Sequence, residues 1–253
     1  MKLFDLKGKV AVVTGGSKGI GRSICENLAE AGAKVVVSSR KLPACEEVVA
    51  GIKQAGGEAM AVSANISDKA SLEALIAGTR KAWGKVDVLV CNAASNPYYG
   101  SLSGLGDEVF DKIMRNNVLS NLWLANLVLP EMVQRKDGVI IIVSSIGGLR
   151  GTGVLGAYGI SKAADMALVR NLATEWGPHN IRVNAIAPGL IKTDFAKALW
   201  TNPEHLSRAE GLSPLRRIGE PDDIGGIAVM LAGKAGAFIT GQVIVADGGA
   251  TII

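Results

Sequence analysis

Tyr158 and Lys162 lie four residues apart at the start of a stretch with helical spacing. Residues i and i+4 share one face of an α-helix, so we expect the Lys162 ammonium near the Tyr158 hydroxyl. A free tyrosine has a pKa of ~10, and a nearby cation favours the phenolate and lowers that pKa. Such a phenol could exchange a proton with a substrate near neutral pH. Because the same spacing also occurs on ordinary surface helices, the rest of the sequence must decide between these interpretations.

A glycine-rich turn, Gly15-x-x-x-Gly19-x-Gly21, follows the first apolar run and precedes a helical stretch. A helix N-terminus presents unpaired backbone N–H groups, and glycines let a phosphate approach them closely. A P-loop of nucleotide triphosphatases has similar glycine spacing, but it needs a lysine where Arg22 stands. A purely structural turn is the other alternative. The order strand, glycine turn, helix favours dinucleotide binding over both.

The second apolar run ends at Ser39, Arg40 and Lys41, with no acidic residue in reach. In dinucleotide-binding folds a carboxylate at this place binds the ribose of NAD, whereas an arginine accommodates the 2′-phosphate of NADP. A bidentate arginine favours a phosphate, and Lys18 in the glycine turn can add charge. The alternative is a solvated Arg-Lys pair at the start of a surface helix. The missing acid favours NADP(H) as the cofactor.

Alternating strands and helices must bring these residues together. Apolar runs predict buried strands at residues 9–14, 34–39, 58–64, 86–91, 138–145, 181–187 and 242–246. Helical spacing predicts helices between them, the longer ones at 107–133 and 158–176 and the last at 222–232. Gly32 is expected to end the first helix, Pro43 to begin the second and Ser67 to cap the third.

This alternation predicts the α/β class. We expect a single doubly wound Rossmann-type domain over residues 1–253, with a parallel sheet of about seven strands and helices on both faces. In such folds ligands bind at the carboxyl ends of the strands, which is where the glycine turn and Arg40 fall.

Composition favours a globular protein with neither nucleic acid nor membrane as partner. The 253 residues are 48% hydrophobic and 20% charged, which suits a large core. A net charge of +4 without a basic run does not favour nucleic acid, and no apolar run is long enough to span a membrane. Three scattered cysteines without CxxC spacing, and no signal-peptide pattern, predict a cytoplasmic protein.

The two histidines, His179 and His205, form neither metal-site nor catalytic-triad spacing. Zinc alcohol dehydrogenase and serine hydrolase chemistry are therefore not expected, and no metal is predicted.

Taken together, the motifs resemble those of the short-chain dehydrogenase/reductase family in order and spacing, over nearly the whole chain. They are Thr14-Gly15-x3-Gly19-x-Gly21, Asn92-Ala93-Ala94, Asn117, Ser144-Ser145, Tyr158-x3-Lys162, Pro188-Gly189, Gly241-Gln242 and Asp247-Gly248-Gly249. Residues 92–100 and 188–200 look most like the NADPH-dependent carbonyl and retinal reductase branch. The resemblance implies an oxidoreductase that transfers a hydride between NADP(H) and a small carbonyl or secondary alcohol substrate.

The resemblance also implies roles for individual residues. Tyr158 would be the general acid in carbonyl reduction and the general base in alcohol oxidation, and Lys162 would lower its pKa and hold the nicotinamide ribose. Ser145 matches the serine that hydrogen-bonds the substrate oxygen, with Ser144 a bystander. A serine with no histidine or acid partner is a poor nucleophile, so a hydrogen-bonding role suits Ser145. Asn117 resembles the asparagine that anchors a proton-relay water.

The implied cofactor contacts come from every strand end in the family pattern. They are Gly15, Ser17, Lys18, Gly19, Ile20, Gly21, Ser39, Arg40, Asn65, Asn92, Ala93, Tyr158, Lys162, Pro188, Gly189, Ile191 and Thr193. The chain departs from the commoner pattern at Asn65, where the family often has an aspartate near the adenine. An asparagine can still donate or accept there, so only that adenine contact is in doubt.

Residues 190–217 are predicted to form a mobile substrate loop, in which Phe195 and Trp200 either line an apolar pocket or only pack. Other large side chains, among them Trp83, Trp123 and Met230, fall on helical stripes and are expected in the core.

Two functional alternatives stay open. A 3-oxoacyl-[acyl-carrier-protein] reductase shares every motif and would meet an acidic carrier protein with its net positive surface. A non-catalytic NADP(H)-sensing protein would keep the fold, but the complete Asn117, Ser145, Tyr158 and Lys162 set argues against it. The resemblance further implies a homotetramer.

Overall fold

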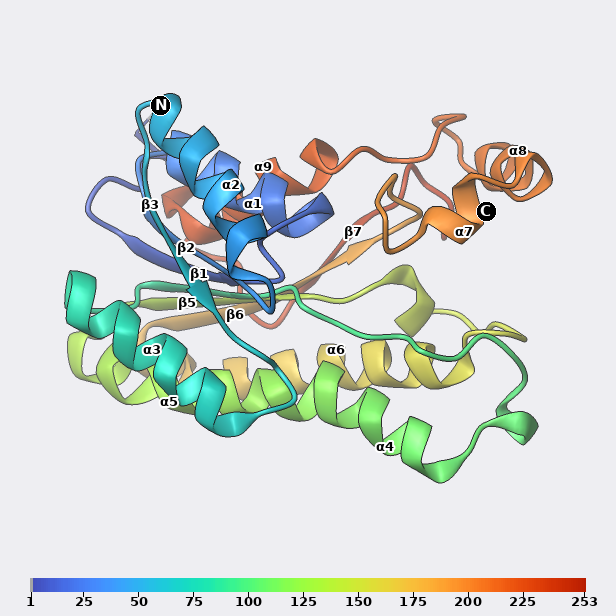
Figure 1. Ribbon diagram of the computed structural model, residues 1–253, viewed down its shortest axis with the longest axis horizontal. Coiled ribbons are helices and arrows are strands. Elements are labelled where there is room, and N and C mark those ends of the chain that lie inside the picture. Colours follow the sequence, from blue (N-terminus) through green and yellow to red (C-terminus); the bar gives the residue numbers. More distant parts are fainter. Residues whose placement is uncertain (1) are drawn as a thin grey trace.

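The structure is a computed structural model that describes residues 2–253. Within that range, seven strands form one parallel sheet in the order β3-β2-β1-β4-β5-β6-β7 (Figure 1). The strands are β1 (Val10–Thr14), β2 (Lys34–Ser39), β3 (Glu58–Ser63), β4 (Val88–Cys91), β5 (Gly138–Val143), β6 (Ile181–Pro188) and β7 (Val243–Ala246). The direction of the strand order reverses between β1 and β4. This confirms the predicted doubly wound Rossmann-type fold.

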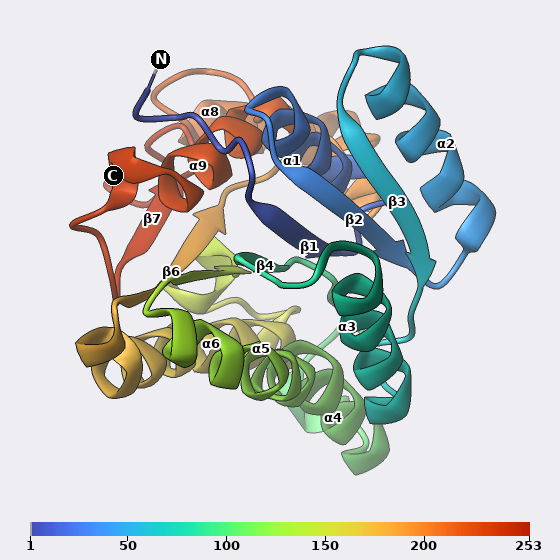
Figure 2. The same ribbon diagram turned by 90° about the vertical axis from the view of Figure 1, so that its left-hand side faces the viewer.

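Helices cover both faces of the sheet (Figures 1 and 2). One face carries α1 (Gly19–Glu30), α2 (Leu42–Gln54) and α9 (Asp222–Ala232). The other carries α3 (Lys69–Trp83), α4 (Asp107–Met114), α5 (Ser120–Arg135) and α6 (Gly156–Trp176). The short helices α7 (Lys197–Trp200) and α8 (Pro203–Leu212) follow β6. They lie inside the stretch that the sequence predicts as the substrate loop.

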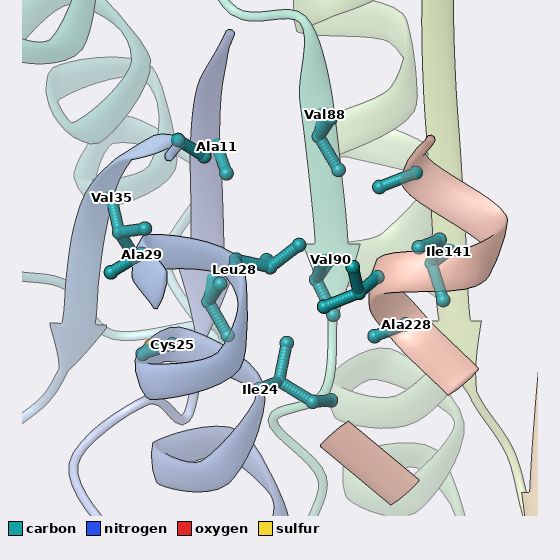
Figure 3. Close-up of a cluster of buried hydrophobic side chains, with 14 of the residues drawn as sticks. Ala11, Ile24, Cys25, Leu28, Ala29, Val35, Val88, Val90, Ile141 and Ala228 are labelled. Carbon is teal, nitrogen blue, oxygen red and sulfur yellow. The ribbon is translucent and has the colours of Figure 1, made fainter. Parts of the chain in front are cut away.

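Each face of the sheet packs its own apolar core, because the central strands are apolar on both sides. Neighbouring strand residues point to opposite faces, so Val13 belongs to the core under α1 and α9 while Val12 belongs to the core over α5 and α6. Figure 3 shows Ile24 of α1 with Val90 of β4 and Ala228 of α9 in the first of these cores. The two cores hold the strand ends in register at the edge where the site lies.

Of the three helix ends predicted from Gly32, Pro43 and Ser67, two are confirmed. Gly32 has a φ of 98° just after α1, and Pro43 lies in the first turn of α2, as expected. The prediction of Ser67 as the cap of α3 is wrong. Asp68 is the cap, since its Oδ1 accepts a hydrogen bond from a first-turn N–H at 3.0 Å. The Ser67 hydroxyl instead donates to Asn65 Oδ1 at 3.1 Å.

The helix expected over residues 107–133 is interrupted. A π-helix, Arg115–Leu119, joins α4 to α5 and contains Asn117. Such π-helical turns occur frequently at functional sites. Their i→i+5 hydrogen bonds accommodate one extra residue in the helix, and no particular residue type marks the place. The hydrophobic spacing could not reveal it.

The cysteines Cys25, Cys45 and Cys91 are free and buried. Over residues 2–253, no helix is both long and apolar enough to cross a membrane.

Candidate active site

A cavity of about 1500 Å³ opens at the carboxyl edge of the sheet. Its wall includes residues at or just beyond the ends of β1 to β7. Among the sequence-predicted site residues, only Asn117 does not line it. The sheet therefore gathers side chains that are spread over residues 15–193 into one concave space.

The glycine turn between β1 and α1 leaves room for a ligand close to its backbone. Gly15 and Gly19 have φ values of 66° and 53°, which side chains other than glycine rarely adopt. A Cβ on Gly21 would collide with the Gly15 carbonyl and with Asn92 Nδ2. Among the described residues, no side chain caps the first turn of α1. The N–H groups of this helix end are left for an anion, as phosphate binding requires.

Asn92 and Ala93, just after β4, hold the glycine turn in place. Asn92 Nδ2 donates to the carbonyls of Thr14 and Gly15 at 3.0 and 3.2 Å. The Thr14 hydroxyl oxygen accepts from the N–H groups of Asn92 and Ala93 at 3.1 and 3.2 Å. Asn92 therefore supports the glycine turn, and its contact with a cofactor stays a prediction.

The end of β2 brings Ser39, Arg40 and Lys41 to the same cavity. The Arg40 side chain is exposed and faces solvent at the rim. Asn65, after β3, lines the cavity as well. Its Oδ1 accepts hydrogen bonds from the N–H and the hydroxyl of Ser67 at 3.2 and 3.1 Å, which leaves its amide nitrogen to donate.

The segment after β6 reaches over the glycine turn. A Cβ on Gly19 would lie 2.9 Å from Thr193 Cγ2, so these two segments are in contact. A Cβ on Gly189 would lie 2.8 Å from the Asp247 backbone, which makes glycine necessary there. Ile191 is buried in the core next to the cavity. Together with Pro188, this segment lines the cavity.

Ser145, two residues after β5, and Tyr158 of α6 lie next to a short 3₁₀ turn, Ile146–Gly148. Ser145 Oγ accepts from the Gly147 N–H at 3.0 Å. A Cβ on Gly147 would lie 3.4 Å from Ser145 Oγ and 3.9 Å from the Tyr158 ring, so both side chains border the same space. A Cβ on Gly159 would lie 2.7 Å from the Gly147 carbonyl oxygen. The missing side chain at Gly159 lets α6 approach this turn.

Lys162 is 2% exposed, and its ammonium is held on two sides. Nζ donates to the Val143 carbonyl at 2.9 Å and to Asp165 Oδ2 at 3.0 Å, and it lies 5.8 Å from the centre of the Tyr158 ring. Burial acts to lower the pKa of Lys162, but the charges of Asp165 and Tyr158 act against it, and the pKa is raised above its usual range. Lys162 is therefore a buried, protonated cation beside the tyrosine.

Ser144 has a structural role, since its hydroxyl donates to the Lys162 carbonyl at 2.8 Å. The side chain of Asn117 also makes structural hydrogen bonds. It accepts from the Ser95 N–H at 2.8 Å and donates to the Ser95 carbonyl and to Ser161 Oγ at 3.0 Å. The role of Asn117 in holding a water stays a prediction.

In the segment that follows β6, Phe195 and Trp200 behave differently. The Phe195 ring is 58% exposed and its centre lies 6.1 Å from that of Tyr158. Trp200 does not line the cavity, because its ring N–H donates to the Thr193 carbonyl at 2.8 Å and it packs on its own loop. Trp200 therefore packs within its loop, whereas Phe195 lines the cavity, and a contact of Phe195 with the substrate stays a prediction.

His205 and Arg208 line the cavity from α8 and are not among the site residues predicted from the sequence. Their helix has a recognisable start, since Asn202 Oδ1 accepts from the N–H groups of Glu204 and His205 at 2.9 and 3.2 Å. Asparagine followed by proline is a typical helix start, and it could have revealed α8. Asp165, the buried partner of Lys162, is not among the residues predicted from the sequence either.

Metal ligands do not cluster in the described part of the chain. Over residues 2–253, no group of three or more His, Cys, Asp or Glu side chains could hold a metal ion.

The structure defines a Rossmann-type protein in which the glycine turn and the Ser145, Tyr158 and Lys162 cluster line the same cavity. The family model described as enoyl-(acyl carrier protein) reductase matches residues 15–251. Dehydrogenase/reductase SDR family member 4 from Bos taurus is 40% identical over 244 residues, which are 96% of this chain and 88% of that protein. Dehydrogenase/reductase SDR family member 2, mitochondrial, from Homo sapiens is 38% identical over 97% of this chain and 88% of its own length.

Solved structures also match this chain over nearly its whole length. A 7α-hydroxysteroid dehydrogenase complexed with NADH and 7-oxo glycochenodeoxycholic acid superposes with a TM-score of 0.94 at 38% identity, over 98% of this chain and 96% of that one. A gluconate 5-dehydrogenase from Burkholderia cenocepacia in complex with NADP and tartrate superposes with a TM-score of 0.95 at 27% identity, over 100% and 98%. The chain belongs to the short-chain dehydrogenase/reductase family, whose members are oxidoreductases that use nicotinamide cofactors.

Proposed function

We propose that this protein transfers a hydride between NADP(H) and a carbonyl or secondary alcohol substrate, with Tyr158 as the general acid and base. The observation that carries the proposal is that Ser145, Tyr158 and Lys162 line the same cavity as the glycine turn. An acid–base group and a nucleotide cradle in one space suit a reaction in which a hydride and a proton go to the same carbonyl group.

The residues present fit a dinucleotide. The glycine turn leaves the N–H groups at the start of α1 open to a pyrophosphate, and Gly21 keeps the approach clear. Pro188, Gly189, Ile191 and Thr193 suit the nicotinamide end. When bound there, the nicotinamide supplies or accepts the hydride.

NADP(H) is the proposed form of the cofactor because Arg40 stands at the end of β2, where an acid would bind the ribose of NAD. Lys18 adds a second exposed cation, although it also pairs with Asp194 at 3.4 Å. The related structures include complexes with NADH and with NADP. The preference for NADP(H) is therefore argued from the residues of this chain.

Side chains of this protein transfer the proton and stabilise the negative charge that develops in the reaction. In reduction, Tyr158 donates its phenolic proton to the carbonyl oxygen as negative charge develops on it, and Ser145 donates a hydrogen bond to the same oxygen. The Lys162 cation beside the ring stabilises the resulting phenolate. In alcohol oxidation the same steps run in reverse, with Tyr158 as the base.

A panel of ketones, aldehydes and secondary alcohols, assayed with NADPH and with NADH, tests this proposal in the wild-type protein and in Tyr158→Phe. We expect the variant to lose turnover by 10²-fold or more, on the order of what a positioned proton donor contributes. Its NADPH dissociation constant should change little, because the phenol ring stays in place. Near-normal turnover of Tyr158→Phe would overturn the assignment of the acid.

The alternatives predict other results. A 3-oxoacyl-[acyl-carrier-protein] reductase would prefer an acyl thioester over every simple carbonyl in the panel. A sensing protein would bind NADPH and turn over none of the substrates. The homotetramer and the cytoplasmic location stay predictions from the sequence.

A further inference from the structure

Asp165 and Asn121 form a buried polar cluster with Lys162. The proposed mechanism uses Lys162 but gives no role to the other two residues. Asp165 is 0% exposed. Its Oδ2 accepts from Lys162 Nζ at 3.0 Å, and its Oδ1 accepts from Asn121 Nδ2 at 2.9 Å. Asn121 Nδ2 also donates to the Asn117 carbonyl at 2.6 Å, and Lys162 Nζ to the Val143 carbonyl at 2.9 Å. The cluster ties together the π-helix, α5, α6 and the end of β5.

A buried carboxylate beside a buried ammonium is costly unless both groups are fully hydrogen-bonded. Here both Asp165 oxygens have a donor. An ammonium has three N–H donors, and Lys162 uses two of them on Val143 and Asp165. Since Lys162 also lines the cavity, the third donor is left for a ligand there.

We propose that Asp165, oriented by Asn121, is a positioning residue that keeps the Lys162 ammonium charged and fixed in one direction toward the bound cofactor. The proposal rests on the proposed function only in taking the cofactor as the ligand of Lys162. Asp165 itself touches neither substrate nor cofactor, since it does not line the cavity.

Two other titratable groups act on Lys162, and the test must account for them. The Cys91 thiol, from β4, keeps its proton because burial and then Asp165 raise its pKa well above the usual range. Tyr158, from α6, is the other group. A Tyr158→Phe background removes the phenol from the measurement.

The first experiment measures the pair itself, without any activity. Thermal unfolding of Lys162→Met, Asp165→Leu and the double variant forms a double-mutant cycle. We expect the double variant to melt at a higher temperature than Asp165→Leu alone, because it no longer leaves an unpaired ammonium buried. Strictly additive losses of melting temperature would show that the pair is not coupled and would overturn the proposal.

The second experiment measures the NADPH dissociation constant from pH 6.5 to 9, in Tyr158→Phe with and without Asp165→Asn. Without its counter-charge, burial lowers the pKa of Lys162, so the cation is lost as the pH rises. We therefore expect NADPH binding by the Asp165→Asn variant to weaken by roughly tenfold or more across this range, the loss of about one charge-assisted hydrogen bond. The parent should show a flat profile there.

Asp87→Asn in the same background is the matched control. Asp87 is a buried carboxylate at the opposite end of the sheet, paired with Lys85 at 2.9 Å and hydrogen-bonded to the Val10 N–H at 2.8 Å. The Asp87→Asn variant should have a lower melting temperature, while its pH profile of NADPH binding should stay flat. If Asp165→Asn behaves in the same way, Asp165 is only structural. If even the wild-type protein binds no NADPH, the proposed function fails, while the unfolding cycle still decides whether the pair is coupled.

Discussion

Single charged side chains at the rim of the cavity differ in how firmly they are held. Arg217 donates to Asp223 Oδ1 at 2.8 Å, and the Glu220 N–H donates to the same carboxylate at 2.8 Å. These contacts hold the start of α9 against the loop before it. Arg40, by contrast, is exposed at the end of β2, and its guanidinium gives this place its charge. Arg217 therefore contributes to stability, whereas Arg40 has the role in cofactor recognition that we propose.

Replacing Arg40 with aspartate should shift the cofactor preference toward NADH. The carboxylate would repel the 2′-phosphate and could bind the ribose of NAD instead. We expect kcat/KM with NADPH, relative to NADH, to fall by about 10- to 100-fold, which corresponds to one charge-assisted hydrogen bond. Lys53→Asp, an exposed charge reversal at the end of α2, is the control. Unchanged preference in Arg40→Asp would refute the proposed cofactor.

Asp223→Asn should show a pH-dependent loss of stability. The hydrogen bonds from Arg217 and from the Glu220 backbone hold the pKa of Asp223 at about 2. A depressed folded-state pKa means that the carboxylate stabilises the protein above its unfolded pKa of ~3.9, and that this stabilisation is lost as the pH falls to about 2. The difference in melting temperature between variant and wild type should be present at pH 6 and shrink below pH 4. A difference that persists unchanged at pH 3 would contradict it.

At the scale of elements, the geometry of the proposed catalytic residues depends on how closely α6 packs against the turn that carries Ser145. That approach needs glycine at position 159, because the Gly147 carbonyl oxygen occupies the space of a side chain. The long helical pattern around Tyr158 predicts α6, but it does not show that α6 contacts the turn at Gly147, which lies outside the helix. The same is true of the π-helix around Asn117, whose extra residue leaves no mark on the hydrophobic spacing.

Gly159→Ala should therefore separate α6 from the Ser145 turn. We expect it to destabilise the protein by about 1–3 kcal/mol, as overpacking does, and to lower kcat more than NADPH affinity. Gly78→Ala, inside α3 with no atom within 4 Å of the new carbon, is the matched control. It should raise the melting temperature, since alanine is favoured over glycine in a helix by roughly 0.5–1 kcal/mol. Equal effects of the two substitutions would show that the close approach at Gly159 does not matter.

At the scale of the whole molecule, the cavity draws its walls from the ends of all the strands that form the sheet. A ligand that fills it would contact elements from both layers of helices, through the glycine turn before α1 on one face and Lys162 of α6 on the other. Such a ligand stabilises the folded state as a unit, because the unfolded chain has no such cavity.

NADPH should thus raise the melting temperature of the whole protein in one transition. At 100 times the dissociation constant, binding adds about 2.7 kcal/mol, which for a domain of this size is roughly 5–10 °C. NADH at the same concentration should give a smaller shift, and Arg40→Asp should reduce the difference between the two. Calorimetry at several concentrations checks this. Equal shifts from both nucleotides would speak against NADP preference.

The sequence by itself determined the sheet, the order of its elements and most of the cavity wall. Buried strands, glycine turns and helix ends are local patterns, and a doubly wound sheet leaves one edge at which such turns can meet. Tertiary structure decided what local patterns do not encode. Whether Phe195 or Trp200 faces the cavity depends on a hydrogen bond within their loop. Whether Asp165 is a surface charge or the buried partner of Lys162 depends on which face of α6 the sheet covers, since burial is what turns an ordinary ion pair into a fixed one.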